Sequence, residues 1–247
     1  GAPAVLAGRV YLTDAGNHVL ALDAANGTKL WSWDGIPEEI ALLGTPAPAV
    51  DDNSVIAALS SGQIVSLGLT DGQPVWDERF NSVGGVTTDL TALHDIAGVP
   101  VVDQGRAYAV SANGRMMAID IASGRRLWQK DVRGTGSIWA AGDVVFLTTR
   151  EGVSARLTAD GSPLWDAPLP QYNDPDDKED PIHWYGPYLL NGKLYTFGSA
   201  GKAVVNDPAT GKQLAVISIE DNLAAAPAVA NGMAAMINES GKISLWK

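Results

Sequence analysis

The sequence contains no cysteine and is poor in basic residues. Without cysteine the chain has no disulfide, no thiolate metal ligand and no cysteine nucleophile. Its 17 Lys and Arg against 28 Asp and Glu give a formal net charge of −11. That balance argues against binding to nucleic acid or to an anionic membrane surface. No apolar run reaches the roughly 18 residues that would span a bilayer, and no stretch shows sustained helical periodicity.

What the sequence does have is an internal repeat in which a glycine is followed four residues later by tryptophan. The pairs are Gly27 and Trp31, Gly72 and Trp76, Gly124 and Trp128, and Gly161 and Trp165. A fifth copy has Gly211, with Ala215 at the tryptophan position. A second series of turn glycines, from Gly16 to Gly241, recurs at a mean spacing of about 45 residues.

Each repeat contains short runs of β-type residues separated by turn dipeptides such as Asn26-Gly27 and Asp71-Gly72. About four short antiparallel strands every 45 residues predict an all-β fold, a β-propeller of four-stranded blades. A β-sandwich of similar hairpins is the alternative, but a sandwich does not require five copies of one pattern. The predicted blades are residues 1–34, 45–80, 98–132, 135–168, 187–219 and 225–247 of a single partial propeller.

The last repeat stops after the strand that ends at Trp246, without the strand that follows the tight glycine turn in the other repeats. Because unpaired strand edges invite aggregation, a closed propeller is expected to complete this blade. The strand count therefore predicts about five blades plus a three-stranded sixth, as the C-terminal part of a longer propeller.

Candidate catalytic and metal-binding residues are few. His18, His94 and His183 have no partner at a catalytic spacing, and His94 beside Asp95 is interpreted as a solvated loop pair. Residues 171–186 form an acidic insertion that contains five acids between Asp174 and Asp180. Its spacing matches no calcium loop, so we interpret it as a solvated insertion. We predict no catalytic residue, no metal site and no cofactor.

The pattern that ends in Gly-x-x-x-Trp resembles the tryptophan-docking motif of the PQQ-like propeller superfamily. The resemblance implies that Trp31, Trp76, Trp128 and Trp165 pack between neighbouring blades, with the glycines setting the turns beneath them. One branch of this superfamily is the quinoprotein dehydrogenases, which bind PQQ and calcium. The adjacent cysteine pair that many of those enzymes place over the cofactor is missing here. This absence argues against a PQQ- and calcium-dependent dehydrogenase, which we keep as an alternative.

Residues 88–102, residues 118–130 and the closing Gly-Lys-Ile-Ser-Leu strand are similar to the BamB family of outer-membrane assembly lipoproteins. That family has eight blades, so about the first third would be missing from this chain. The resemblance implies a non-enzymatic scaffold of the outer-membrane β-barrel assembly machinery. It also implies a location at the periplasmic face of the bacterial outer membrane, through an N-terminal lipid anchor that this chain lacks.

In the BamB family two neighbouring inter-blade segments contact a periplasmic domain of BamA, the barrel-forming subunit. The resemblance maps the first segment to Ile40, Leu42 and Leu43, where Leu43 replaces an arginine of the best-known members. It maps the second to the segment from Asp89 through Leu93 to Asp95. Apolar side chains in such a connection either pack against the blade or form an interaction patch, and the residues leave both open.

The expected partners are therefore the periplasmic domain of BamA and, as a further class, unfolded outer-membrane proteins. A generic periplasmic propeller that binds proteins or ligands in its central channel is the third alternative.

Overall fold

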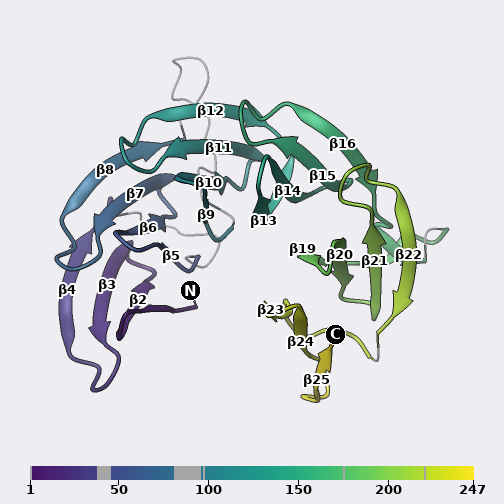
Figure 1. Cartoon of the computed structure of the whole chain (residues 1–247). Coiled ribbons are helices and arrows are strands. Elements are labelled where there is room, and N and C mark those ends of the chain that lie inside the picture. Colours follow the sequence, from purple (N-terminus) through teal and green to yellow (C-terminus); the bar gives the residue numbers. More distant parts are fainter. Residues whose placement is uncertain (1, 38–45, 81–95, 97, 175, 220) are drawn as a thin grey trace.

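The computed structural model describes residues 2–37, 46–80, 96, 98–174, 176–219 and 221–247. These residues contain strands and turns but no helix, and the strands form five four-stranded sheets, one three-stranded sheet and one two-stranded sheet. All pairings within the sheets are between antiparallel neighbours along the chain. Figure 1 shows the sheets arranged as blades around an arc. The all-β propeller predicted from the repeats is confirmed.

The first three blades each have four strands, and the fourth strand of each lies on the outside of the arc (Figure 1). Blade 1 comprises β1 (Ala4–Leu6), β2 (Arg9–Thr13), β3 (His18–Asp23) and β4 (Lys29–Asp34). Blade 2 comprises β5 (Ala49–Val50), β6 (Ser54–Ala58), β7 (Gln63–Gly68) and β8 (Pro74–Arg79). Blade 3 comprises β9 (Val101–Asp103), β10 (Arg106–Val110), β11 (Arg115–Asp120) and β12 (Arg126–Asp131).

Blades 4 and 5 also have four strands, whereas blade 6 has three. Blade 4 comprises β13 (Gly134–Ala141), β14 (Val144–Thr149), β15 (Gly152–Leu157) and β16 (Pro163–Pro168). Blade 5 comprises β19 (Trp184–Leu190), β20 (Lys193–Gly198), β21 (Lys202–Asn206) and β22 (Gln213–Ser218). Blade 6 has three strands, β23 (Ala228–Ala230), β24 (Met233–Ile237) and β25 (Ile243–Trp246). Between blades 4 and 5, β17 (Tyr172–Asp174) and β18 (Glu179–Pro181) form a separate hairpin.

The hydrophobic core consists of layers between neighbouring blades. Successive side chains of a strand point to opposite faces of its sheet, so each middle strand supplies two layers. In β6, Val55 and Ala57 pack in the layer between blades 1 and 2. Ile56 and Ala58 pack in the layer between blades 2 and 3. Because both faces are covered, β6 is buried along its whole length.

A tryptophan on the fourth strand joins each of the first four blades to the next one. Its indole N–H donates to a main-chain carbonyl in the third-to-fourth-strand turn of the following blade, which accounts for the polar atom of a large, mostly buried ring. The Nε1–O distances are 3.3 Å from Trp31 to Leu69, 2.6 Å from Trp76 to Ile121, 2.9 Å from Trp128 to Thr158 and 3.0 Å from Trp165 to Pro208.

The repeat glycine lies beneath the indole that arrives from the preceding blade. A Cβ atom on Gly72 would lie 2.5 Å from the ring of Trp31, closer than real Cβ atoms come to their neighbours. The same approach recurs between Gly124 and Trp76, between Gly161 and Trp128, and between Gly211 and Trp165. Each of these glycines therefore leaves room for the indole of the tryptophan in the preceding blade.

Two positions depart from this pattern. Gly27 of blade 1 has the same left-handed backbone as its counterparts, with φ of +75°, but nothing lies within 4 Å of the Cβ position. Ala215 of blade 5 occupies the tryptophan position and is exposed. The seam between blades 5 and 6 uses another aromatic contact, in which Trp246 packs edge-on against Tyr195 with ring centroids 4.8 Å apart.

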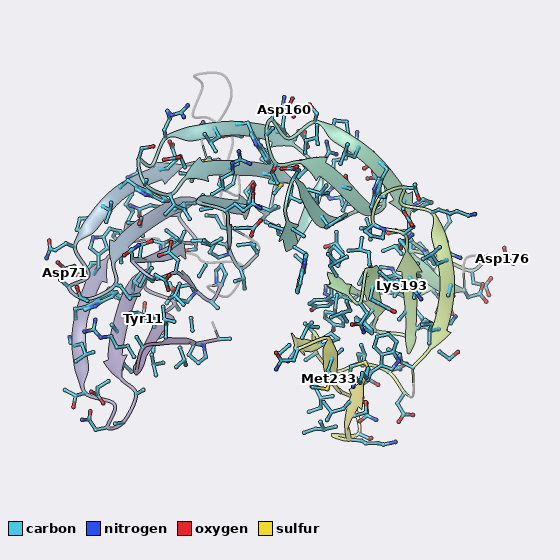
Figure 2. All side chains as sticks on the ribbon, in the orientation of Figure 1. Tyr11, Asp71, Asp160, Asp176, Lys193 and Met233 are labelled. Atoms are coloured by element: carbon cyan, nitrogen blue, oxygen red, sulfur yellow. The ribbon has the colours of Figure 1, made fainter. Side chains whose placement is uncertain are left out.

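The third-to-fourth-strand turns share a second feature. An aspartate in each turn accepts, through its carboxylate, the main-chain N–H groups of residues two or three positions after it. In blades 3 to 5 a hydroxyl donates to the same carboxylate, from Ser123 to Asp120, from Ser162 to Asp160 and from Thr210 to Asp207. These hydroxyl hydrogen bonds are the largest cause that lowers the pKa of each of the three aspartates below the ordinary value of 3.8. Asp160 and the equivalent Asp71 of blade 2 lie on the outer rim (Figure 2).

We predict that Gly72→Ala destabilises the protein more than Gly27→Ala does. Both substitutions place a side chain in a left-handed conformation, which costs about 1–2 kcal/mol. Only the Cβ at Gly72 also meets an indole, so overpacking should add about 1–3 kcal/mol. Urea unfolding of the two variants measures the difference, and equal losses would contradict the role assigned to the indole contact.

We predict that Asp160→Asn makes the melting temperature less sensitive to acid. A pKa lowered in the folded state gives stability that is present above the unfolded value and is lost as the pH falls through the folded value. The variant should therefore show a smaller fall in melting temperature than wild type between about pH 5 and about pH 3. Asp143→Asn removes the same charge at an exposed turn of the same blade and is the control for net charge. An equal effect of the two variants would contradict the role of the hydrogen bonds to Asp160.

Candidate functional site

The described starts of the connections between blades lie on one face of the arc. Because the strands of a blade are antiparallel, the second-to-third-strand turns lie on the same face as the connections that follow the fourth strands. We call this face the connection face. Main-chain hydrogen bonds join the two sets, from the N–H groups of Gly35, Phe80, Val132, Leu169 and Ile219 to the carbonyls of Asn17, Gly62, Gly114, Glu151 and Gly201.

The six residues predicted to bind a partner belong to the first two of these connections. Ile40, Leu42 and Leu43 lie in residues 38–45, and Asp89, Leu93 and Asp95 lie in residues 81–95. Both segments are outside the described residues. The structure does describe the residues from which each connection begins.

Two side chains hold the start of the first connection. Asn17 donates from Nδ2 to the carbonyl of Ile36 at 2.9 Å, while Gln63 accepts the Ile36 N–H through Oε1 at 3.3 Å. Asn17 Oδ1 also accepts from the N–H and the hydroxyl of Ser60, at 3.1 and 2.9 Å. Asn17 is buried, so it fixes the connection to blades 1 and 2 at the same time.

Apolar side chains hold the second connection at both ends. Phe80 is 4% exposed and Ile96 is 1% exposed, and both pack in the layer between blades 2 and 3. Ile96 also forms an isolated antiparallel bridge with Ser111 of blade 3. The two connections that contain the predicted residues thus begin at fixed points on adjacent blades.

Sequence reasoning did not identify Asn17 and Gln63. Asn17 adopts a φ of +63° in the second-to-third-strand turn of blade 1, a conformation that asparagine tolerates better than most residues. An asparagine directly after the turn glycine was therefore a usable signal for the turn. The contact of its side chain with Ile36 and Ser60 depends on the pairing of two blades, which the local pattern does not show.

The histidines form no catalytic arrangement within the part of the chain that the structure describes. His18 Nδ1 lies 2.9 Å from Asp14 Oδ2, and the hydrogen bond to this carboxylate is the main cause that raises the pKa of His18 above 6.5. The ring of His183 contacts that of Tyr185 edge-on, with centroids 4.7 Å apart. His94 lies outside the described residues. No group of three or more potential metal ligands occurs among the described side chains.

A pocket of about 380 Å³ lies between blades 3 and 4 at the connection face. Four of its five charged lining residues are paired, because Arg133 lies 3.0 Å from Glu151 and Arg156 lies 3.9 Å from Asp166. The fifth, Asp131, accepts the main-chain N–H of Arg133 at 3.2 Å. The acidic insertion of residues 171–186 lies in the next connection, between blades 4 and 5. The structure places the hairpin of β17 and β18 there, with Asp176 at the outer rim (Figure 2).

The comparisons with known proteins separate the candidate families. A family model described as "Outer membrane protein assembly factor BamB" matches residues 1–167. The chain belongs to the BamB family. The match ends before the acidic hairpin begins at Tyr172.

Curated BamB proteins are among the relatives. The chain is 29% identical to BamB of Yersinia pestis over 164 residues, which is 66% of this chain and 42% of that protein. It is 31% identical to BamB of Pseudomonas aeruginosa over 127 residues, which is 51% of this chain and 33% of that protein. The chain thus spans well under two thirds of the curated BamB proteins it matches.

Solved structures agree on the fold. The structure of BamB from Moraxella catarrhalis superposes with a TM-score of 0.80 at 21% identity, over 99% of this chain and 71% of that chain. A quinohemoprotein alcohol dehydrogenase from Pseudomonas putida superposes with a TM-score of 0.66 at 16% identity, over 88% of this chain and 41% of that chain. At these identities the likeness concerns the propeller fold alone. Among the described residues there is no helix of the length and hydrophobicity needed to cross a bilayer.

We predict that Asn17→Ala lowers the free energy of unfolding by about 2–3 kcal/mol, because it removes three hydrogen bonds and leaves buried partners unsatisfied. Asn17→Gly should lower the free energy of unfolding nearly as much, although glycine accepts a positive φ. This variant therefore distinguishes the loss of the hydrogen bonds from backbone strain. Asn53→Ala, in an exposed turn, is the control and should change stability little. Urea unfolding measures all three, and a wild-type stability for Asn17→Gly would refute the role of the amide.

Proposed function

We propose that this chain acts as a non-enzymatic scaffold of the outer-membrane β-barrel assembly machinery, at the periplasmic face of the outer membrane. The observation that carries the proposal is membership of the BamB family, whose curated members are named as assembly factors. A rigid set of blades supports a binding role, because a preorganised surface loses little conformational freedom on association. The lipid anchor that the family resemblance implies would provide the attachment to the membrane.

The proposed partner is the periplasmic domain of BamA, and the proposed contact residues are Ile40, Leu42 and Leu43 with Asp89, Leu93 and Asp95. The support from the structure is the way both connections begin. Asn17 and Gln63 hold the start of the first, while Phe80 and Ile96 hold the second. The described residues that flank the proposed contact segments therefore have fixed positions on adjacent blades.

Unfolded outer-membrane proteins are a second proposed partner class, favoured by the outer strands of the blades. β4, β8, β16 and β22 are each the outermost strand of a sheet. Each presents an exposed aliphatic residue at the same place in the repeat: Leu30, Val75, Leu164 and Leu214, which are 44–58% exposed. Exposed strand edges with apolar side chains are suited to pairing with an extended chain.

We predict that the chain binds the soluble periplasmic domains of BamA from the same organism and that Leu42→Asp weakens this binding at least tenfold. A buried charge without a partner at an interface costs more than about 1.4 kcal/mol, which corresponds to that factor. Leu164→Asp makes the same chemical change at an exposed outer-strand position and should leave the affinity unchanged. Calorimetric titration of the three proteins measures the effect.

The absence of saturable binding by the folded wild-type chain would reject BamA as a partner of this chain. Equal weakening by Leu42→Asp and Leu164→Asp would reject the connection face as the interface. Tight binding of PQQ that requires calcium would instead favour the dehydrogenase alternative.

A further inference from the structure

A groove of about 190 Å³ lies between the acidic hairpin and the outer half of blade 5. Its apolar lining comes from Tyr172 on one wall, Ile182 and Trp184 after the hairpin, and Val204 and Val216 on the blade. Trp184 is held in place because its Nε1 donates to the carbonyl of Pro170 at 2.8 Å. The groove is therefore built from fixed elements on both sides.

The strand along one side of this groove is unusually open. The residues from Gln213 to Val216 on β22 are all exposed, with Leu214 at 49% and Val216 at 54%. β22 is the outermost strand of its sheet, so its outer edge has no strand partner among the described residues. An apolar groove beside a free strand edge is suited to an extended segment of another protein.

The hairpin that supplies Tyr172 and Asn173 to the groove carries a strong negative charge, although its carboxylates are not among the residues that line the groove. Between Tyr172 and Pro181 it carries five carboxylates and one lysine, all on exposed residues. None of these carboxylates forms an ion pair with the described residues. Asp174 serves the turn, where it accepts the N–H of Asp176 at 3.0 Å, and the other four acids project without such a structural role in the described contacts.

The nearby bases do not neutralise the hairpin. Lys178 belongs to the hairpin itself. Lys202 donates from Nζ to Asn173 Oδ1 at 3.1 Å, and both residues line the groove. With both lysines counted the surface keeps an excess of three carboxylates. The complementary partner is therefore a cationic one, and nucleic acids and anionic lipids are excluded by the sign of the charge.

We propose that this groove binds an extended segment of a partner protein in which apolar and basic side chains alternate. The apolar side chains of one face of the segment would fill the groove along β22. The lysines or arginines of the other face would lie against Asp176, Asp177, Glu179 and Asp180. Alternation is required because successive side chains of an extended chain point in opposite directions.

This surface differs from the one assigned to BamA. It lies in the connection between blades 4 and 5, outside the residues that the family model matches, whereas the BamA segments lie in the first two connections. The proposal therefore does not depend on the contact with BamA, and a failure of either can be recognised separately. It shares the outer edge of β22 with the surface proposed for unfolded outer-membrane proteins, and it adds the side-chain chemistry of the segment that would bind there.

The probe is a short synthetic peptide in which lysine and valine alternate, with benzoylphenylalanine at its centre for photo-crosslinking. A second peptide with glutamate at every lysine position is the control. Titration of the full chain should give saturable binding of the lysine peptide that weakens with added salt, and no binding of the glutamate peptide. Mass spectrometry of the irradiated complex should place the crosslink on β17, β22 or Trp184.

Matched variants locate the charge. Asp177→Asn combined with Asp180→Asn should weaken the lysine peptide about three- to tenfold, as expected for the loss of two exposed ion pairs. Asparagine also accepts the positive φ of 53° at Asp180, so the hairpin should keep its conformation. The control is Asp52→Asn combined with Asp143→Asn, which removes the same charge at exposed turns on the opposite face and should leave binding unchanged.

Val216→Asn tests the apolar lining, since it removes an exposed aliphatic side chain from the groove and should also weaken the peptide. Three results would each overturn the proposal. The first is equal weakening by the two double variants, which would indicate an effect of net charge alone. The second is a crosslink outside the groove, and the third is the absence of saturable binding of the lysine peptide.

Discussion

The contact between a tryptophan of one blade and a glycine of the next is the interaction on which the arrangement of blades 1 to 5 depends. It combines close packing of a large ring with a hydrogen bond from the indole to the main chain, so both the apolar and the polar parts of the side chain are satisfied. Side-chain layers between sheets can slide or tilt, whereas a donor directed at one carbonyl sets a specific register. The core layers then fill the space that this register defines.

The arrangement of neighbouring blades set by the tryptophan contacts also positions residues on the connection face. Once neighbouring blades are fixed, Asn17 of blade 1 can reach Ser60 of blade 2 and the main chain of Ile36 together. Phe80 and Ile96 likewise enter a layer that two blades share. The described ends of these two connections therefore take their positions from the packing of the sheets. A binding surface made of such connections can be varied in sequence while its supports remain constant.

The repeat explains how much could be predicted from the sequence. The spacing of Gly27 and Trp31 and of their later copies is local, so the blades and the fold were accessible from periodicity. The partner of each indole is not local, because Trp31 meets Gly72 rather than its own Gly27. The roles of Asn17 and Gln63 and the groove beside the acidic hairpin also arise only when distant segments are brought together. The BamA-binding residues rest on family resemblance and remain predictions, since they lie outside the described residues.

The one-way sense of the tryptophan contact makes the propeller modular. Each complete unit offers an indole at its forward side and a bare glycine turn at its rear side, so any unit that carries both can follow any other. Gene duplication could then lengthen such an array by whole units without a new interface having to be invented. The junction between blades 5 and 6 differs, because blade 5 has Ala215 at the tryptophan position and Trp246 contacts Tyr195 instead. Units are therefore not interchangeable at this junction. A unit placed at that junction would need a neighbouring unit with a complementary aromatic contact.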